Sequence, residues 1–258
     1  RSSSAASDVY KRQFLLSRPR FEDDFGGTYI LIEPGKFIMG DVVGDGLSRE
    51  CPSHEVEIDA PFFIGQRPVT QMHWETIMGY NPSKFQQGWS SGLRPVDSVT
   101  LQDCIEFISK LNQSHNTKQR LSLDGIWRLP TEAEWEYSAR SGSETKWCFG
   151  NFDGDLDDYG WHAGNSGAST REVGLKKANT WELHDMYGLI SEWCQDNYRP
   201  AYTIKSKQKP YLDGADIYCV RGGSWFTESD STRSSARGQA KSNKRSDGIG
   251  LRLVWEPL

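Results

Sequence analysis

The sequence predicts one irregular, aromatic-rich domain that combines short strands with short helices. Its 258 residues include 10 Trp, 25 Gly and 11 Pro, and 12% of them are aromatic, a composition typical of a fold with many turns. A chain of this length can form one large domain or two small ones. Because it contains neither an internal repeat nor a low-complexity linker, we expect a single domain.

The first residues differ in character from the rest of the chain. Residues 1–13 are small and polar and lack the apolar core of a signal peptide. We interpret them as a non-native or disordered leader and assign residues 14–258 to the domain. They do not predict a cellular compartment.

Apolar runs bounded by turn residues predict the strands of the first half. The expected strands are Tyr29–Ile32, Lys36–Met39, His54–Ile58 and Pro61–Gly65. Pro34 and Gly35 interrupt the apolar pattern between the first two, which predicts a hairpin. His54 stands beside Glu55, and we interpret it as a surface histidine of a strand rather than as part of a site.

Three helices are predicted from apolar spacing and capping residues. They cover Gln71–Met78, Thr100–Asn112 and the segment from Thr131 to Arg140. Thr70 is a suitable N-cap for the first, and Gly79 ends it. Thr131 and Glu134 form the pattern of a capping box. The acidic residues of this third helix favour its dipole, so we interpret Glu132, Glu134 and Glu136 as structural rather than as acid–base catalysts.

Charge, hydropathy and cysteine content exclude several classes of protein. The net charge is -5 without a basic stripe, which argues against a nucleic-acid partner. No apolar run approaches the roughly 20 residues that a membrane helix needs, so no membrane span is expected. The five cysteines are far apart and lack CxxC spacing, which argues against a disulfide framework or a zinc site. We expect most of them to be buried thiols, and they leave the redox compartment open.

Two acidic stretches are candidates for a hard cation. Residues 151–167 contain Asp153, Asp155, Asp157 and Asp158, but they lack the downstream bidentate Glu of an EF-hand loop. In the second stretch, Asp185 and Glu192 bracket the turn residue Gly188. Such a turn can gather side-chain and carbonyl oxygens, which calcium prefers.

The segment from Tyr218 to Val254 resembles a site more than a scaffold. It begins with the apolar run Tyr218–Val220 and a glycine pair, Gly222-Gly223, and it ends in the strand-like alternation Ile249–Val254. About two dozen mostly polar residues lie between the two expected strands. A long polar segment held between strands is a common position for a binding or catalytic surface, although it is equally consistent with a solvated loop.

The order of several motifs resembles the formylglycine-generating enzyme family, also called sulfatase-modifying factor. The motifs are GKFIMG at 35–40, PFFI at 61–64 with PVT at 68–70, WRLPTEAEWEY at 127–137, EW at 192–193 and RGGSW at 221–225. They span about Tyr29 to Val254, nearly the whole chain. The resemblance implies a single compact α+β domain, the variant of the C-type lectin fold found in that family, with little regular secondary structure.

The resemblance also implies where catalysis would reside. The family's oxidase binds Cu(I) through two cysteines that follow the GGS motif and converts a cysteine of a sulfatase CxPxR motif to formylglycine. The matching positions here are Thr227 and Thr232, and no cysteine follows Cys219. Because a hydroxyl cannot replace a thiolate as a Cu(I) ligand, we expect neither copper nor the family's mechanism.

A structural calcium site of the family carries over to this chain by resemblance. Its ligands match Asp185, Gly188, Ile190 and Glu192, with Gly188 and Ile190 contributing backbone carbonyls. Asp185 stands where the enzyme has Asn and keeps an oxygen ligand. The run from 188 to 193 departs from the family's usual GNVWEW-like sequence.

The leading functional prediction is a non-catalytic ligand-binding protein on this scaffold. The partner would be a protein, peptide or small molecule on the C-terminal loops, with Trp225 and Phe226 as apolar anchors and Arg233 and Arg237 as anion or hydrogen-bond partners. The predicted binding residues are Ser224, Trp225, Phe226, Thr227, Glu228, Asp230, Thr232, Arg233, Arg237, Ser242, Asn243 and Asp247. One such use is the variable protein of a diversity-generating retroelement, which this chain resembles in ending near IGFRLV, here IGLRLV at 249–254.

The alternative is an oxidoreductase of the same family that acts through an altered site. A second enzymatic possibility is a relative of the family's iron-dependent sulfoxide synthases, which carry an HxxxH-type triad in an additional domain. The five histidines of this chain are His54, His73, His115, His162 and His184, and none has that spacing. We therefore rank both enzymatic hypotheses below ligand binding.

Overall fold

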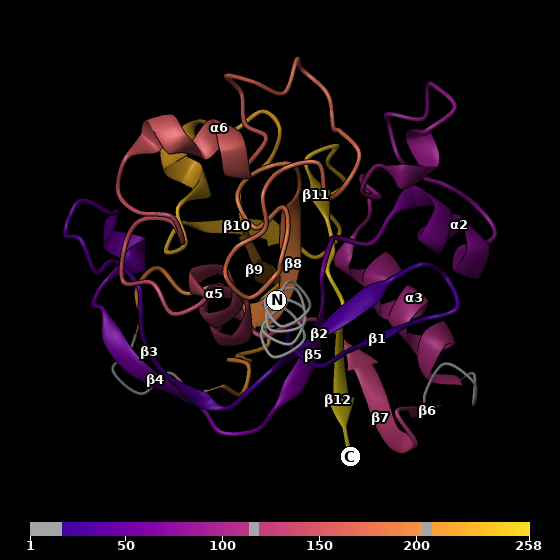
Figure 1. Ribbon diagram of the computed structural model, residues 1–258, viewed down its shortest axis with the longest axis horizontal. Helices are drawn as coiled ribbons and strands as arrows, with labels where there is room; N and C mark the ends of the chain where they lie inside the picture. The colour runs from indigo at the N-terminus through magenta and orange to yellow at the C-terminus, as the bar shows by residue number, and fades with distance from the viewer. Residues whose placement is uncertain (1–16, 114–118, 203–207) are drawn as a thin grey trace, which may run out of the picture.

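The computed structural model describes residues 17–113, 119–202 and 208–258 (Figure 1). The predicted leader, residues 1–13, lies outside the described residues. Within them the chain forms a six-stranded sheet, a four-stranded sheet and a two-stranded sheet, joined by long loops and short helices. None of the helices described is long and apolar enough to cross a membrane.

The six-stranded sheet brings the C-terminal strand to its centre. Its strands, in spatial order, are β1 (Arg20–Glu22), β2 (Thr28–Ile32), β5 (Phe62–Gly65), β12 (Val254–Pro257), β7 (Leu123–Arg128) and β6 (Gln119–Arg120). Trp255 of β12 lies opposite Phe63 of β5 and Trp127 of β7. Both flanking pairs are antiparallel, so the last strand joins the first quarter of the chain to its middle.

The four-stranded sheet carries the predicted site. Its order is β10 (Arg237–Lys241), β9 (Ile217–Arg221), β8 (Ser191–Asn197) and β11 (Ile249–Gly250), with β11 parallel to β8. β9 confirms the strand predicted around Tyr218–Val220. β10 was not predicted, because its sequence RGQAK lacks the apolar alternation of a typical strand.

The hairpin predicted around Pro34 is wrong. β3 (Gly35–Met39) pairs with β4 (His54–Ile58), and β2 lies between β1 and β5. The fully buried Ile30 and Ile32 place β2 in the six-stranded sheet, where neighbours on both sides satisfy its backbone. His54 is also not a surface residue, because its ring is buried and lies 5.0 Å from that of Tyr202.

The single strand predicted over Ile249–Val254 is divided between two sheets. Residues 249–250 belong to the four-stranded sheet as β11, and β12 begins at Val254 in the six-stranded sheet. Leu251, Arg252 and Leu253 cross between the sheets and are buried. The carbonyl of Leu251 accepts a hydrogen bond from the amide of Val69, and that of Leu253 accepts one from the amide of Gly65. These bonds fix the crossing segment, although it belongs to no strand.

The three predicted helices are confirmed, the first with its predicted bounds and the other two with bounds shifted by one residue. They are α2 (Gln71–Met78), α3 (Leu101–Gln113) and α5 (Glu132–Arg140), and a short α6 (Leu156–Tyr159) follows. The Thr70 cap and the capping box of Thr131 and Glu134 are both present. Single 3₁₀ turns occur at η1 (Ser48–Glu50), η2 (Ser91–Leu93), η3 (Asp153–Asp155) and η4 (Ser229–Thr232).

Two apolar clusters form the core. In Figure 1, α2 and α3 lie on one side of the sheets, and α5 and α6 lie on the other. The rings of Trp74 and Phe107 stack at 4.9 Å and join α2 to α3. Trp135 of α5 belongs to the second cluster with Met186 and Cys219. The packing of α5 against β8 and β9 positions the end of β9, where the predicted site begins.

Candidate functional site

Two glycines turn the chain sharply at the end of β9. Gly222 and Gly223 have φ values of 94° and 72°, which side-chain-bearing residues rarely adopt. A Cβ on Gly223 would lie 2.8 Å from Oγ1 of Thr227 and 2.9 Å from the carbonyl oxygen of Ser231. Glycine is therefore required for conformation and for space, and the turn folds the following segment back on itself.

Thr227 and Thr232, which the resemblance matches to copper-binding cysteines, use their hydroxyls in hydrogen bonds within the fold. Thr227 Oγ1 accepts from the amide of Ser224 at 2.9 Å and donates to its carbonyl at 3.0 Å. Thr232 is fully buried, and its Oγ1 accepts from Nε1 of Trp147 at 3.1 Å and donates to the carbonyl of Ser229 at 2.7 Å. Both hydroxyls therefore stabilise the loop.

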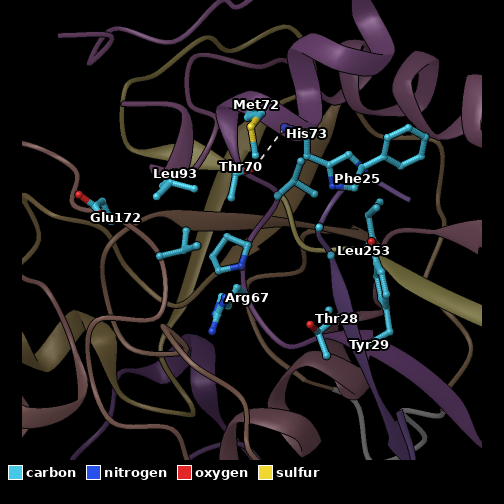
Figure 2. A pocket seen from close by; sticks show the side chains of 16 residues that line it. Phe25, Thr28, Tyr29, Arg67, Thr70, Met72, His73, Leu93, Glu172 and Leu253 are labelled. Atoms are coloured by element: carbon cyan, nitrogen blue, oxygen red, sulfur yellow. Dashed lines mark hydrogen bonds between the residues drawn. The ribbon is translucent and has the colours of Figure 1, made fainter. Parts of the chain in front are cut away.

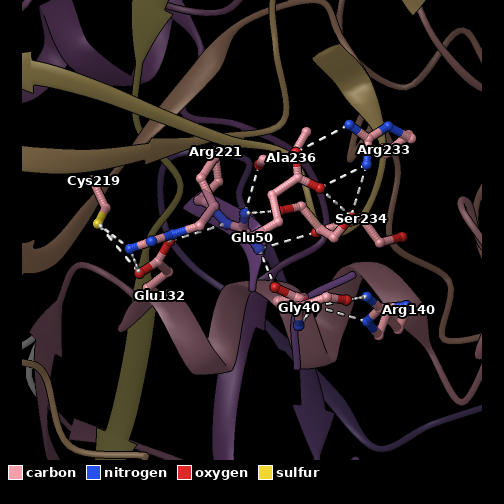
Figure 3. A network of polar contacts seen from close by, with 12 residues as sticks. Gly40, Glu50, Glu132, Arg140, Cys219, Arg221, Arg233, Ser234 and Ala236 are labelled. Atoms are coloured by element: carbon pink, nitrogen blue, oxygen red, sulfur yellow. Dashed lines mark hydrogen bonds and ion pairs between the residues drawn. The ribbon is translucent and has the colours of Figure 1, made fainter. Parts of the chain in front are cut away.

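A buried ion pair holds the loop from the N-terminal half of the chain (Figure 3). Arg233 donates two hydrogen bonds to Glu50, at 2.6 and 3.0 Å, and Oγ of Ser235 donates to the same carboxylate at 2.7 Å. Burial disfavours the Glu50 carboxylate, but these bonds outweigh that effect and lower its pKa. The pair ties η1 to the C-terminal segment, 183 residues further along the chain.

A second set of ion pairs joins α5 to β9 and β10. Arg237 donates to Glu132 at 2.6 and 2.8 Å. Glu136 accepts from Arg140 at 2.9 Å and also from Arg221, whose guanidinium reaches the carbonyls of Ser235 and Ala236. Burial opposes ionisation of Glu132, yet the charges of Arg237 and Arg221 lower its pKa.

These contacts show how the acidic residues of α5 are used. Glu132 and Glu136 pair with buried arginines, and Glu134 pairs with Arg128 at 2.6 Å. They are structural, as predicted, but ion pairing across the fold accounts for them better than the helix dipole does. The same contacts correct the prediction for two arginines. Arg233 and Arg237 are 5% and 2% exposed and already carry carboxylate partners, so neither offers a free guanidinium to an anion.

A cavity of about 550 Å³ lies over this network. Of the predicted residues, Thr227, Asp230, Arg233 and Arg237 line it. The lining also includes Asp45 and Leu47 on the loop before η1, Arg49 within η1, and Lys146, none of which the sequence singled out. Asp45 and Lys146, which lie far apart in the sequence, form an ion pair. The volume lies in the range of small-molecule sites, and its wall is predominantly polar.

Trp225 and Phe226 form a separate apolar surface. The ring of Trp225 packs edge-on against Phe85 at 5.3 Å and against Phe226 at 4.9 Å. Its Nε1 donates to the carbonyl of Asp247 at 2.9 Å, and the Asp247 carboxylate pairs with Lys84. Phe226 is 47% exposed. The structure therefore adds Lys84 and Phe85 to the predicted apolar anchors, and neither is among the residues that line the 550 Å³ cavity.

The remaining predicted binding residues are scattered. Ser224 is buried, and its hydroxyl has no hydrogen-bond partner among the described residues. Glu228 is exposed at the start of η4. Ser242 donates to Asp216, and Asn243 beside it is exposed. The last two follow β10 and do not line the cavity.

The two carboxylates among the predicted calcium ligands differ in their availability to a cation. Asp185 is buried, and its Oδ1 is unpartnered in the described parts of the chain, although Oδ2 accepts from the amide of Gly174 at 2.7 Å. Burial raises the pKa of Asp185 to about 6. Glu192 is occupied, because Arg252 donates to both of its oxygens and Trp135 Nε1 donates to one at 2.7 Å. Asp185 thus has one carboxylate oxygen without a partner among the described residues, which a cation could use. Glu192 could bind a cation only through an oxygen that also accepts from Arg252.

The other candidate metal ligands are engaged or dispersed. Asp157 accepts from His162 at 2.9 Å and from Asn165 at 2.8 Å, and Asp158 pairs with Lys177. Among the described residues, no group of three or more His, Cys, Asp or Glu is arranged to hold a metal ion. His115 lies outside these residues. Cys219 is buried, and burial raises its thiol pKa well above the usual value, so it is not a reactive thiolate.

Short sheets, few helices and long packed loops define the class of protein as an α+β domain with a C-type lectin-like fold. The chain belongs to the sulfatase-modifying factor enzyme 1-like domain family, whose model matches residues 19–257. Both the fold and the family resemblance predicted from the motifs are confirmed.

Two curated relatives differ in what their names imply. The chain is 25% identical over 298 residues to the inactive C-alpha-formylglycine-generating enzyme 2 of Mus musculus, covering 93% of this chain and 90% of that protein. It is 28% identical over 268 residues to the hercynine oxygenase of Mycolicibacterium thermoresistibile, covering 89% of this chain. It spans only 59% of that oxygenase.

The fold is also similar to that of a solved structure, Treponema denticola variable protein 1. The TM-score is 0.81 with 28% sequence identity, and the match covers 93% of this chain and 99% of that one. The similarity therefore extends over nearly the whole domain.

Proposed function

We propose that this chain is a non-catalytic ligand-binding protein whose ligand contacts the C-terminal loops. The observation that carries the proposal is the use of Thr227 and Thr232. By the resemblance, each stands at the position of a copper-binding cysteine. The hydroxyl of each is already engaged in hydrogen bonds within the protein. A hydroxyl is a poor ligand for Cu(I), so the family's chemistry lacks its metal centre here.

The preformed cavity supports binding of a polar ligand. Its walls are held by ion pairs that join distant segments, Glu50 to Arg233 and Asp45 to Lys146. A wall that is already ordered loses little conformational entropy when a ligand binds. The exposed Phe226, beside Trp225, adds an apolar contact on the same C-terminal segment.

The first experiment tests catalysis directly. Purified protein loaded with copper is incubated with a CxPxR peptide and oxygen, and mass spectrometry is used to detect the aldehyde product. We expect no conversion above a protein-free control while an active formylglycine-generating enzyme converts the peptide alongside. Conversion by this protein would overturn the proposal and favour the alternative, an oxidoreductase with an altered site, which the similarity to hercynine oxygenase also supports.

Within the binding proposal, we favour a variable protein of a diversity-generating retroelement. The similarity to Treponema denticola variable protein 1 supports this subtype. Sibling copies in the same genome should then differ at exposed loop positions such as Phe226, Glu228, Asp230 and Ser231, while the buried Thr232 and Arg233 stay constant. Identical loops among sibling copies would exclude the subtype and leave the binding proposal standing.

We also propose a structural calcium ion beside Asp185. Its buried Oδ1, unpartnered among the described residues, supports the site, with carbonyls of Gly188 and Ile190 as further oxygen ligands and Glu192 sharing an oxygen with Arg252. Adding calcium after chelator treatment should raise the melting temperature of the protein but not of Asp185→Ala. Equal shifts in both proteins, or no shift in either, would contradict it.

A further inference from the structure

A second cavity, of about 160 Å³, lies apart from the C-terminal loops (Figure 2). The turn of residues 25–29, the segment from Gly65 to the first turn of α2, Leu93, residues 172–173 and Leu253 line it. In Figure 2, Leu93 and Glu172 lie on one side of this space, and Phe25 and Leu253 lie on the other. The cavity shares no lining residue with the one over the ion-pair network.

The walls of this second cavity are held by hydrogen bonds. The Asp23 carboxylate accepts from the amides of Phe25 and Gly27 at 2.8 and 2.7 Å and from the Tyr29 hydroxyl at 2.9 Å. On the other side, the amide of Val173 donates to the carbonyl of Leu93 at 3.0 Å. The space is therefore a preformed feature of the fold rather than a gap between loose loops.

Much of the lining is apolar. Val69, Met72, Leu93, Val173 and Leu253 contribute to it, and Met72 and Leu93 remain 50% and 43% exposed. Aliphatic side chains left open to solvent beside a small cavity favour an apolar body of a few carbon atoms.

One cation at the cavity is unpaired among the described residues. Arg67 is exposed and lines the cavity, and in the described parts of the chain it makes neither a side-chain hydrogen bond nor an ion pair. Its side chain lies over Gly174, where a Cβ would come within 2.5 Å of Nε. Gly174 has a φ of 76°, so the absence of a side chain there both permits the turn and makes room for the guanidinium.

A helix end and a buried histidine also line the cavity; burial lowers the pKa of His73, so this ring offers a hydrogen-bonding group rather than a positive charge. Thr70, the N-cap of α2, and Met72 in its first turn line the cavity, so the N-terminus of this helix lies beside it. His73 also lines the cavity and is 4% exposed, and its Nε2, 3.8 Å from Oδ2 of Asp23, has no hydrogen-bond partner within the described ranges. A buried ring nitrogen without a partner is a hydrogen-bonding group left for a ligand or an ordered water.

Glu172 limits which anions fit. Glu172 lines the cavity and forms no ion pair among the residues the structure describes. A ligand with a second negative charge would meet this carboxylate, and like charges at close range repel. The wall thus favours one negative charge attached to an apolar body.

We propose that this cavity binds a small aliphatic monocarboxylate, with its carboxylate on Arg67 and its chain against Met72, Leu93 and Val173. This inference does not depend on the function proposed for the C-terminal loops. Ligands of this size bind weakly, and we expect dissociation constants of about a millimolar.

The test is an NMR titration of the ¹⁵N-labelled protein with three probes of equal chain length: hexanoate, adipate and hexanamide. Hexanoate should shift the amide signals of residues 69–73 and 172–174, adipate should bind more weakly, and hexanamide weakest of all. The absence of any shift at up to about 50 mM hexanoate, or equal shifts with hexanamide, would overturn the proposal.

Two variants with matched controls assign the roles. Arg67→Gln should weaken hexanoate binding about tenfold, whereas Lys244→Gln, which removes an exposed charge elsewhere, should not. Glu172→Gln should bring adipate close to hexanoate, and Glu75→Gln on the exposed face of α2 should leave the difference intact. Superimposable spectra away from the cavity show that each variant is folded. Equal affinities for Arg67→Gln and Lys244→Gln would overturn the assignment to Arg67.

Discussion

The carboxylate of Glu50 shows how a single residue can organise a loop far away in the sequence. It is fully buried and receives three hydrogen bonds from Arg233 and Ser235. A buried charge is tolerated only with such partners, so the pair specifies where the C-terminal segment must lie.

Glu50→Gln is therefore expected to destabilise the protein by about 3 kcal/mol, because it leaves the Arg233 charge buried without its carboxylate. Urea denaturation provides the measurement. Glu55→Gln is the matched control, since the Lys36–Glu55 pair is more than half exposed and should contribute less than about 1 kcal/mol. Similar losses for the two variants would contradict the role assigned to Glu50.

The titration of Asp196 should make the free energy of unfolding depend on pH. Burial, and then the charge of Glu132, raise its pKa to about 7, although the amides of Tyr211 and Glu132 donate to it. A raised folded-state pKa means that the folded protein binds this proton more tightly than the unfolded chain. The contribution of this group to stability is thus fully present below about pH 4 and is lost as the pH rises toward 7.

A single titrating group can lower the free energy of unfolding by as much as about 1.4 kcal/mol per pH unit. We expect Asp196→Asn to reduce this dependence on pH. Free energies of unfolding measured from pH 4 to 8 would reveal the change in slope. The exposed Asp59→Asn should keep the wild-type slope. Identical profiles for all three proteins would show that Asp196 does not titrate in this range.

The turn after β9 is an element that only glycine can build. At Gly223 the left-handed conformation coincides with close contacts to Thr227 and Ser231, whereas Gly214 has a similar φ of 80° and room for a Cβ among the described residues. The two positions therefore separate backbone strain from crowding.

Gly214→Ala should cost about 1 kcal/mol from the backbone alone. Gly223→Ala should cost about 1 to 3 kcal/mol more, because the added methyl group crowds the loop. Denaturant midpoints at constant m-value would measure both. If the two substitutions cost the same, crowding at Gly223 contributes nothing.

We expect the two larger sheets to unfold as one cooperative unit, because the chain crosses between them near its end. Leu251 and Leu253 are buried in the crossing from β11 to β12. Their backbone carbonyls are bonded to residues near the start of α2 and the end of β5. Loss of packing here should therefore weaken both sheets together.

Leu251→Ala should lower the free energy of unfolding by about 2 to 5 kcal/mol while keeping a single transition. Far-UV circular dichroism and tryptophan fluorescence should report the same midpoint. Leu258→Ala, at a position 77% exposed at the end of the sequence, should change stability by less than about 0.5 kcal/mol. Separate midpoints for the two probes would show that the sheets unfold independently.

The sequence by itself determined the local elements and the family. Thr70 with Gly79 and the Thr131–Glu134 capping box predict helices because caps act within four residues of the helix end. The ordered motifs identified the fold and the family, because residue identity at a motif position is readable directly. The prediction that Thr227 and Thr232 replace copper-binding cysteines comes from the same motif positions and stays a prediction.

Only the tertiary structure decided the strand pairing, the state of the arginines and the shape of the cavities. β2 and β3 are neighbours in sequence yet belong to different sheets, and Arg233 finds its partner 183 residues away. Local patterns report which residues prefer burial but not which distant segment buries them. Arg67 and Arg237 look alike in the sequence, but Arg237 forms an ion pair with Glu132 of α5, whereas Arg67 lines the smaller cavity and forms no ion pair among the described residues.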